Sequence, residues 1–296
     1  MNRIFNLGSV NIDHVYRVPH FVRPGETLAA SSYSRGAGGK GFNQSIALAR
    51  AGAAVCHVGA TGADADWLRS WLQTEGVDIR HLALSDEPTG HAVIQVSDAG
   101  ENSIVLHGGA NHAIPPQAVS KAIADARPGE WFLCQNETSS VPEALRIAKA
   151  AGLHVSFNPA PMSPEVLTYP LDCVDWLIVN ETEGAELSGE AQPDRIVSQL
   201  RERWAGTSIL LTLGGEGALC SEASGVIRIP APRVIPVDTT AAGDTFVGYF
   251  LGTLAAGGTL NASLAMAIDA AAITVTRPGA ADSIPLRSEI TGKSNS

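Results

Sequence analysis

Short apolar runs alternate with longer amphipathic segments along most of the chain. The apolar runs, typical of buried strands, occupy residues 4–10, 55–61, 131–135, 154–157, 176–179 and 209–213. In the segments between them, apolar residues recur every three or four positions, as in Trp67, Leu68, Trp71 and Leu72 or in Val141, Leu145 and Ala148. Strands that alternate with helices predict an α/β fold, with a mostly parallel central sheet covered by helices on both faces.

Two regions interrupt this alternation. Residues 14–36 contain a turn at "RPGE" and a polar "SSYS" run, and residues 91–107 contain two alternating runs around a glycine turn, which is a hairpin signal. Together they predict a small β-sheet that projects from the main one and acts as a lid over a site at the strand ends. No linker is evident elsewhere, so we expect residues 1–296 to form a single domain with these two segments inserted.

The C-terminal part of the chain predicts two helices. In "GDTFVGYFLGTLAAGG" the residues Phe246, Val247 and Phe250 share one face, and "NASLAMAIDAAAITVTR" supplies an Ala-rich helix that can pack closely against it. The tail "TGKSNS" is expected to be frayed.

Composition narrows the class of ligand. The 296 residues are 45% hydrophobic and 17% charged, as in ordinary globular proteins, and the formal net charge is −10. Such a chain lacks the basic surface that nucleic acids and anionic membranes require, so we expect neither as a partner and favour a small molecule. No apolar run is long enough to cross a membrane, and four widely spaced cysteines show no metal-ligand pattern. We therefore expect a cytoplasmic protein.

The glycine-rich stretch "RGAGGKGFNQ" (35–44) allows several interpretations. Gly36, Gly38 and Gly41 formally satisfy the dinucleotide-binding pattern G-x-G-x-x-G, although the preceding residues are too polar for a buried strand. A phosphate-binding Walker loop fails at Ser34, where it needs glycine, and at Gly41, where it needs Ser or Thr. The glycines also fit a loop that merely lets a helix approach a sheet.

A second stretch, "VDTTAAGDTFVGYF" (237–250), combines small residues with an acid at a helix start. Ala241, Ala242 and Gly243 leave the first free N–H groups of the helix open to an anion, which the helix dipole also favours. Asp244 is then either an ordinary N-cap or a base that takes a proton from an alcohol beside a bound phosphate.

Polar residues also follow other predicted strands, where open α/β sheets bind ligands. Their donors and acceptors suit the vicinal hydroxyls of a sugar. These residues are Asn11, Asp13, Gly39, Lys40, Asn43 and Glu137.

With these residues in view, the sequence resembles the ribokinase-like, PfkB family of carbohydrate kinases. "GAGGKGFNQSIALARAG" is similar to the family's first signature and "DTTAAGDTFVGYFLG" to its second, more specific one. Further similarities, in "GSVNID", "GENSIVLHGGAN", "NPAP", "NETEGAEL", "TLGGEGAL" and "VTRPGAADSIP", cover nearly the whole chain. The resemblance makes the glycine-rich stretch a sugar-binding loop and the dinucleotide pattern a coincidence.

The resemblance implies an ATP-dependent kinase that transfers the γ-phosphoryl group to a sugar hydroxymethyl oxygen. Asp244 matches the catalytic base, and the amides of Ala241, Ala242 and Gly243 match the anion hole. D-Ribose, giving D-ribose 5-phosphate, is the first expected substrate. Deoxyribose, another pentose, a ketohexose or a nucleoside are alternatives, as are a non-catalytic sugar-binding protein and, more remotely, a nicotinamide-dependent oxidoreductase.

The remaining site residues and partners are also implied by the resemblance. The six polar residues above match sugar contacts, and the family forms homodimers through the lid. Asn180 and Glu183 match the N-x-x-E motif that the family ties to magnesium and phosphate. Thr212, Gly214 and Gly217 match the nucleotide loop, and Gly243 is also expected to bind the nucleotide. The residues that match the family's potassium site are Asp238, Thr240, Thr274, Arg277, Gly279 and Ser283. Three residues depart from the family pattern: Phe42 and Asn136, which adjoin expected sugar contacts and are candidates for altering specificity, and Ile268, expected near the adenine.

Overall fold

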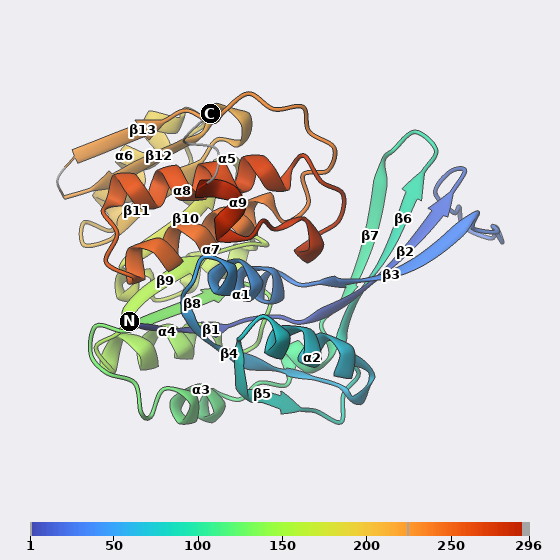
Figure 1. Cartoon of the computed structure of the whole chain (residues 1–296), viewed down its shortest axis with the longest axis horizontal. Coiled ribbons are helices and arrows are strands. Elements are labelled where there is room, and N and C mark those ends of the chain that lie inside the picture. The colour runs from blue at the N-terminus through green and yellow to red at the C-terminus, as the bar shows by residue number, and fades with distance from the viewer. Residues whose placement is uncertain (1, 224, 292–296) are drawn as a thin grey trace.

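The computed structural model describes residues 2–223 and 225–291, which form two sheets and the helices around them. The segment 292–296, most of the tail for which fraying was predicted, lies outside the described residues. Figure 1 shows a large sheet with its helices and a second, narrow sheet that projects to one side.

The main sheet has seven parallel strands and an antiparallel hairpin at one edge. Most strands lie within one or two residues of the predicted runs, although the first ends at Leu7 rather than at residue 10. In spatial order the strands are β13 (Gly225–Ile229), β12 (Ala218–Glu222), β11 (Ser208–Thr212), β10 (Trp176–Asn180), β9 (His154–Asn158), β8 (Trp131–Gln135), β1 (Arg3–Leu7), β4 (Ala54–Thr61) and β5 (Asp78–Leu84).

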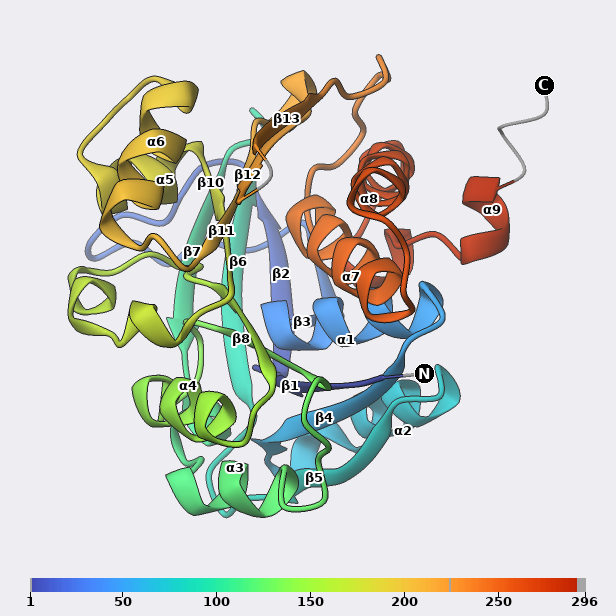
Figure 2. The same cartoon turned by 90° about the vertical axis from the view of Figure 1, so that its left-hand side faces the viewer.

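Helices cover both faces of this sheet, as predicted (Figure 2). Consecutive residues of a strand point to opposite faces, so Ile4 packs in one apolar cluster and Phe5 in the other. The first cluster lies under α1 (Lys40–Arg50), α2 (Asp66–Thr74), α7 (Ala242–Ala255) and α8 (Leu260–Thr274), with α9 (Arg287–Thr291) at their end. The second lies under α3 (Pro116–Ala122), α4 (Val141–Ala150), α5 (Glu181–Ser188) and α6 (Pro193–Arg203).

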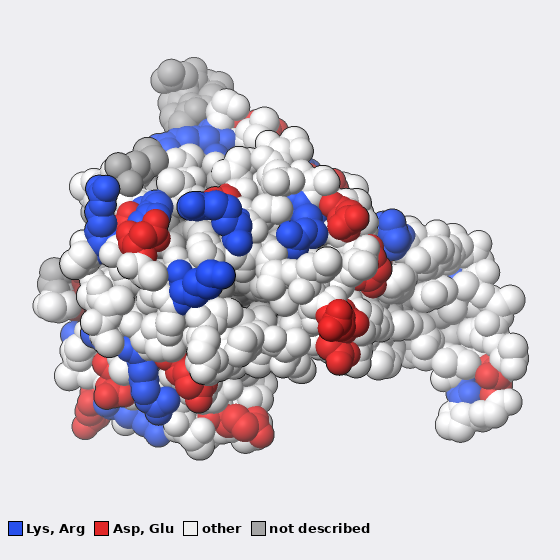
Figure 3. Space-filling model, turned by 90° about the horizontal axis from the view of Figure 1, so that it is seen from below, with Lys and Arg blue, Asp and Glu red and all other residues white. Residues whose placement is uncertain are grey.

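The projecting sheet contains the two regions that interrupt the sequence alternation. Its order is β3 (Ser32–Gly38), β2 (Asn11–Val18), β6 (Gly90–Ser97) and β7 (Asn102–His107), so the predicted hairpin is confirmed. The first inserted segment is longer than predicted, because β2 begins at Asn11 and β3 continues to Gly38. The face of this sheet seen in Figure 3 carries few charged side chains.

Glycines allow the main sheet and α1 to approach very closely. A Cβ atom on Gly41 would lie 2.2 Å from the Cα atom of Gly8 and 2.3 Å from the backbone nitrogen of Ser9. The Phe42 amide donates to the Ser9 carbonyl oxygen at 2.8 Å, which fixes the start of α1 against the end of β1. Gly41 is therefore required by the packing of a helix on a strand, whereas nothing lies within 4 Å of a Cβ built on Gly36.

Candidate active site

Asp244 lies at the start of α7 with its side chain buried at 6% exposure. It is not an N-cap: Ala241 occupies that position with φ 60°, and no side chain caps the helix. Instead the carboxylate accepts hydrogen bonds from two residues of α1, through Oδ2 from Asn43 Nδ2 and through Oδ1 from Gln44 Nε2, each at 2.9 Å. A carboxylate held in this way can accept a proton from an alcohol that approaches from the pocket.

Asn43 has one further hydrogen-bonding atom, Oδ1, which is buried without a partner among the described residues. An unmade hydrogen bond of this kind is costly, and a ligand hydroxyl at this point would satisfy it. The prediction of Asn43 as a ligand contact thus agrees with its position beside the Asp244 carboxylate.

Glu137 joins the end of β8 to the glycine-rich loop. Its Oε2 accepts from the Lys40 amide at 2.9 Å and from the Ser9 hydroxyl, and Ser9 Oγ in turn accepts from the Gly41 amide at 3.2 Å. Gly39 has φ 90°, a left-handed conformation that favours glycine, and caps α1 directly before Lys40. The structure therefore brings Gly39, Lys40 and Glu137 together, as the sequence predicted.

Asn11 and Asp13 enter this region from the projecting sheet. Asn11 Oδ1 accepts from Asn111 Nδ2 at 2.7 Å, and Asn111 Oδ1 accepts from the Val10 amide. A Cβ on Gly38 would lie 2.2 Å from Asp13 Oδ1, so Gly38 makes room for that carboxylate. Two alternate residues of one strand thus point to the same face of the projecting sheet.

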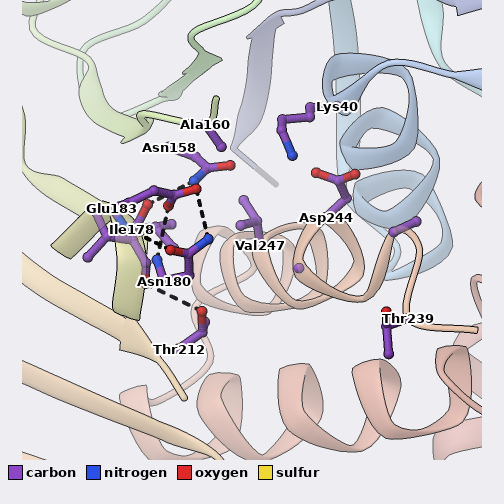
Figure 4. Close-up of a pocket in the computed structure, with 13 residues that line it drawn as sticks. Lys40, Asn158, Ala160, Ile178, Asn180, Glu183, Thr212, Thr239, Asp244 and Val247 are labelled. Atoms are coloured by element: carbon purple, nitrogen blue, oxygen red, sulfur yellow. Dashed lines mark hydrogen bonds between the residues drawn. The ribbon is translucent and has the colours of Figure 1, made fainter. Parts of the chain in front are cut away.

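Several carboxylates share this region with one lysine. Burial, together with the charge of Glu137, raises the pKa of Asp13 to about 6, and burial raises the pKa of Glu137 as well. The charge of Asp244, helped by Glu137 and Glu183, raises the pKa of Lys40, so this lysine keeps its proton. Figure 4 shows the Lys40 side chain and the Asp244 carboxylate turned toward the same cavity.

The raised pKa of Asp13 predicts a cost in stability. The folded state binds the Asp13 proton more tightly than the unfolded chain, so stability falls as the pH rises from about 4 to about 6 and stays lower above it. We expect Asp13→Asn to increase the free energy of unfolding at pH 7.5 by about 1–3 kcal/mol, and this gain to vanish below pH 4. Denaturant unfolding at both pH values measures the difference.

A matched control is Asp98→Asn on the exposed turn between β6 and β7. It should leave stability unchanged within about 0.5 kcal/mol at both pH values. A stability gain in Asp13→Asn that persisted at pH 3.5 would show that the carboxylate charge is not its cause.

Asp244 lines a cavity of about 240 Å³, together with residues at or just after the ends of three main-sheet strands (β9, β10 and β11) and residues of α1, α5 and α7. Asn180 and Glu183 form a capping box at the start of α5: Asn180 Oδ1 accepts from the Glu183 amide at 2.9 Å, and Glu183 Oε2 accepts from the Asn180 amide at 3.0 Å. Both side chains line the cavity as well (Figure 4). The N-x-x-E pattern is thus structural here, and its carboxylate still faces the pocket.

A second, larger pocket of about 620 Å³ adjoins the first, because Thr212, Thr239 and Gly243 line both. Its walls are mostly apolar, which suits a flat heterocycle. The predicted residues Thr212, Gly214, Gly217 and Gly243 all line it, and so does Ile268, expected near the adenine.

The three residues predicted to form an anion hole lie at the start of α7, with Ala241 at its N-cap and Ala242 and Gly243 in its first turn. Ala242 N donates to the Thr239 carbonyl oxygen at 3.3 Å, a long bond that an incoming anion could replace. Gly243 and Asp244 lie in the first turn, where amides have no partner within their own helix.

The residues predicted for potassium lie in two neighbouring loops and one helix end. Asp238 Oδ1 accepts from the Thr240 amide at 2.9 Å and Asp238 Oδ2 from the Gly279 amide at 3.0 Å, so this carboxylate joins the loops. Thr274 directs its hydroxyl into the core toward Thr245, and the cationic side chain of Arg277 has no oxygen, so these two residues can offer only backbone oxygens to an ion. The hydroxyl of Ser283 donates to the Ala280 carbonyl oxygen in its own turn.

Phe42 corrects a sequence-based expectation. Its side chain is fully buried and meets Trp71 edge to face, with ring centroids 5.5 Å apart, so it points into the core rather than toward the sugar side. Its neighbours in α1 face the site because successive helical residues point in different directions. Asn136 donates to the Pro161 carbonyl oxygen and accepts from the Tyr169 hydroxyl, and so it binds a loop that borders the pocket.

The sequence reasoning missed three polar residues of the site. Ser9 and Asn111 orient Glu137 and Asn11, and Gln44 binds Asp244. Gln44 directly follows Asn43 in the glycine-rich stretch, and a buried amide next to a predicted ligand contact was the available signal.

Comparisons with known proteins identify the family of this chain. The chain belongs to the pfkB family of carbohydrate kinases, whose family model matches residues 1–287. The ribokinase of Haemophilus influenzae is 38% identical, in an alignment that covers 96% of this chain and 95% of that protein.

Two solved structures have the same fold over nearly their whole length. The ribokinase of Cryptococcus neoformans var. grubii serotype A, in complex with ADP, has a TM-score of 0.89 and 37% identity, and the match covers 99% of this chain and 100% of that one. The ribokinase of Arabidopsis thaliana, complexed with ribose and ATP, has a TM-score of 0.88 and 29% identity, with 98% of each chain covered. Because β3 belongs to the projecting sheet, the glycine-rich stretch is not the first turn of a dinucleotide-binding unit.

Proposed function

We propose that this protein transfers the γ-phosphoryl group of ATP to the 5-hydroxymethyl oxygen of D-ribose, giving D-ribose 5-phosphate and ADP. The observation that carries the proposal is the position of the Asp244 carboxylate, buried between polar residues suited to a sugar and a cavity suited to phosphates. The similarity to ribokinases over nearly the whole chain supports ribose as the acceptor.

In the proposed reaction Asp244 accepts the proton of the 5-hydroxyl group as its oxygen attacks the γ-phosphorus. The amides of Ala241, Ala242 and Gly243, at the positive end of α7, stabilise the charge on the transferred group. Lys40, which also lines the cavity, adds a fixed positive charge. The sugar is held by Asn11, Asp13, Gly39, Lys40, Asn43 and Glu137.

The nucleotide occupies the larger pocket, with its base against Ile268 and its phosphates along Thr212, Gly214 and Gly217. Asn180 and Glu183 fit a magnesium ion held through water, because the Glu183 carboxylate is already hydrogen-bonded to Asn180 and Mg²⁺ keeps much of its hydration shell. Among the described residues no group of three or more His, Cys, Asp or Glu side chains could hold a metal directly. When bound, Mg²⁺ would neutralise charge on the phosphates.

A potassium ion would fit the oxygen-rich loops around Asp238 and order the segment that leads to Ala241. Burial opposes ionisation of Asp238, but hydrogen bonds from Thr240 and Gly279 outweigh it and lower the pKa of this carboxyl. We expect a higher kcat in potassium than in sodium at equal ionic strength, measured as ADP formation at saturating ribose and ATP. Equal rates with the two ions would contradict this site.

We also propose that the projecting sheet is a lid that closes over the sugar and pairs with the lid of a second subunit. Its strand β7 supports this, because Ile104, Val105 and Leu106 are between 50% and 67% exposed. Light scattering should give twice the chain mass of 30.8 kDa. Leu106→Glu should shift the protein toward the monomer, whereas the same change at exposed Leu84, in the main sheet, should not. A monomeric parent protein would rule out the pairing.

Among the described residues no helix is long and apolar enough to cross a membrane. Four free cysteines, three of them buried, favour a reducing environment, and we propose a cytoplasmic setting without nucleic-acid partners. The chain then functions as one kinase domain with the lid segments inserted.

The acceptor is tested by coupled measurement of ADP formation with ribose, 2-deoxyribose, arabinose, xylose, fructose and nucleosides. We expect the highest kcat/KM with ribose. A higher value with another acceptor would keep the kinase assignment and replace the substrate, and no turnover with any acceptor would favour a binding protein.

A further inference from the structure

The catalytic carboxylate proposed above is bound by an amide whose orientation is not fixed by shape. Gln44 donates from Nε2 to Asp244 Oδ1 at 2.9 Å. If this amide were rotated by half a turn, Gln44 Oε1 would face the carboxylate, and two acceptors would repel each other. The nitrogen and oxygen of an amide have nearly the same size, so neighbouring hydrogen bonds must select the orientation.

One series of hydrogen bonds that selects the orientation of the Gln44 amide begins at His57, a fully buried residue of β4. His57 Nε2 lies 3.2 Å from the Gly8 carbonyl oxygen, which only accepts hydrogen bonds, so Nε2 carries the proton. Burial lowers the pKa of His57 to about 4, and the neutral ring therefore has no proton on Nδ1. Ser45 Oγ, 2.8 Å from Nδ1, must then donate to it.

The donor-to-acceptor direction of these hydrogen bonds continues through the side-chain amides of Asn6 and Gln135. Asn6 Nδ2 donates to the Gly41 carbonyl oxygen at 2.9 Å and to Ser45 Oγ at 2.8 Å, so Asn6 Oδ1 faces the other way. Gln135 Nε2 donates to this oxygen at 2.9 Å and, with its second hydrogen, to Gln44 Oε1 at 2.7 Å. Gln44 Oε1 is thereby occupied, and its nitrogen is left to face Asp244.

A second backbone carbonyl group, that of Ile178, requires the same orientation of the Gln44 amide. Asn158 Nδ2 donates to the Ile178 carbonyl oxygen at 2.9 Å, so Asn158 Oδ1 accepts from Gln44 Nε2 at 3.2 Å. Backbone carbonyls at both ends, which cannot donate, thus determine the direction of every hydrogen bond between them. Gln135 Oε1 is buried without a partner among the described residues. The chain therefore keeps this orientation of the amides even though one acceptor of Gln135 makes no hydrogen bond.

We propose that Gln44 is a positioning residue for Asp244, and that the buried chain His57–Ser45–Asn6–Gln135 holds the Gln44 amide with its nitrogen toward the carboxylate. Asn43 holds the second carboxylate oxygen, and the two donors together fix the plane of the carboxylate. A carboxylate that is fixed in this plane does not spend time in orientations from which it cannot accept the proton of the hydroxyl group. The inference rests on the catalytic role proposed for Asp244.

The test is a double-mutant cycle in the full-length protein. Gln44→Met keeps the length of the side chain and removes the donor, and we expect kcat to fall by about 10- to 100-fold with both KM values within about 2-fold. In an Asp244→Asn background the same change should alter the remaining turnover by less than about 2-fold, because its effect acts through the carboxylate. Thr253→Val is a control on α7: its hydroxyl is buried and has no partner in the described part of the chain, and kcat should not change.

Gln135→Met tests the chain at a residue that does not touch Asp244, and it also serves if Gln44→Met does not fold. Gln135→Met alone should lower kcat by about 2- to 10-fold. Added to Gln44→Met, it should cause no further loss of kcat. Parental kcat in folded Gln44→Met, or equal losses in both backgrounds, would overturn the positioning role while leaving the kinase reaction intact. Parental kcat in Asp244→Asn would instead refute the proposed base, and with it the role of Gln44.

Discussion

Asp244→Asn is expected to lower kcat by about 10²- to 10⁴-fold, the usual contribution of a general base. Asparagine keeps the shape of the side chain but cannot take the proton of the sugar hydroxyl. It also places an amide group where the donors of Asn43 and Gln44 require two acceptors. The KM values for sugar and ATP should stay near those of the parent protein, because the pockets that bind them are lined mainly by other residues.

Steady-state kinetics over sugar and ATP concentrations separate these effects. Asp66→Asn, an exposed acid in the first turn of α2, is the matched control and should retain full activity. A large rise in KM at constant kcat would mean that Asp244 binds substrate without acting as the base.

Gly41→Ala is expected to disrupt both stability and turnover. The added methyl group would meet backbone atoms of Gly8 and Ser9 at 2.2–2.4 Å, and neither can move without shifting the end of β1. Relief of such overpacking typically costs about 1–3 kcal/mol. The movement of α1 would also displace Asn43 and Gln44 from the Asp244 carboxylate, so kcat should fall more than the loss of stability explains.

Gly36→Ala provides the control in the same glycine-rich stretch. A Cβ atom at this position meets nothing within 4 Å, so stability should change by less than about 0.5 kcal/mol and kcat should remain parental. Denaturant unfolding and steady-state kinetics measure the stability and the kcat of both variants. Equal stability and equal kcat in the two variants would mean that Gly41 is not needed for the close approach of α1 and β1.

Local pattern was sufficient for most of the fold. Alternating strands and helices and the hairpin at 91–107 could be predicted because periodicity reports which residues face a core. The first lid segment was predicted too short, since Asn11 and Asp13 are polar residues of a strand whose pairing partner lies more than twenty residues away. The hairpin of β12 and β13 was also missed.

The site was predictable where residue type and chemistry agree, as with Asp244 beside small residues at a helix start. It was not predictable where long-range contacts decide the role. Phe42 follows a glycine loop in sequence, yet its direction is set by packing against Trp71. Gln44 and Asp244 are 200 positions apart, and no local pattern indicates the hydrogen bond between them.

The most direct measurement is identification of the product. The protein is incubated with equimolar D-ribose and ATP in magnesium and potassium, and phosphorus NMR locates the transferred group. The account predicts a phosphomonoester coupled to the two C5 protons, formed in equal amount with ADP and absent with Asp244→Asn over the same time. Phosphate on another hydroxyl, or ADP with free phosphate and unchanged ribose, would contradict it.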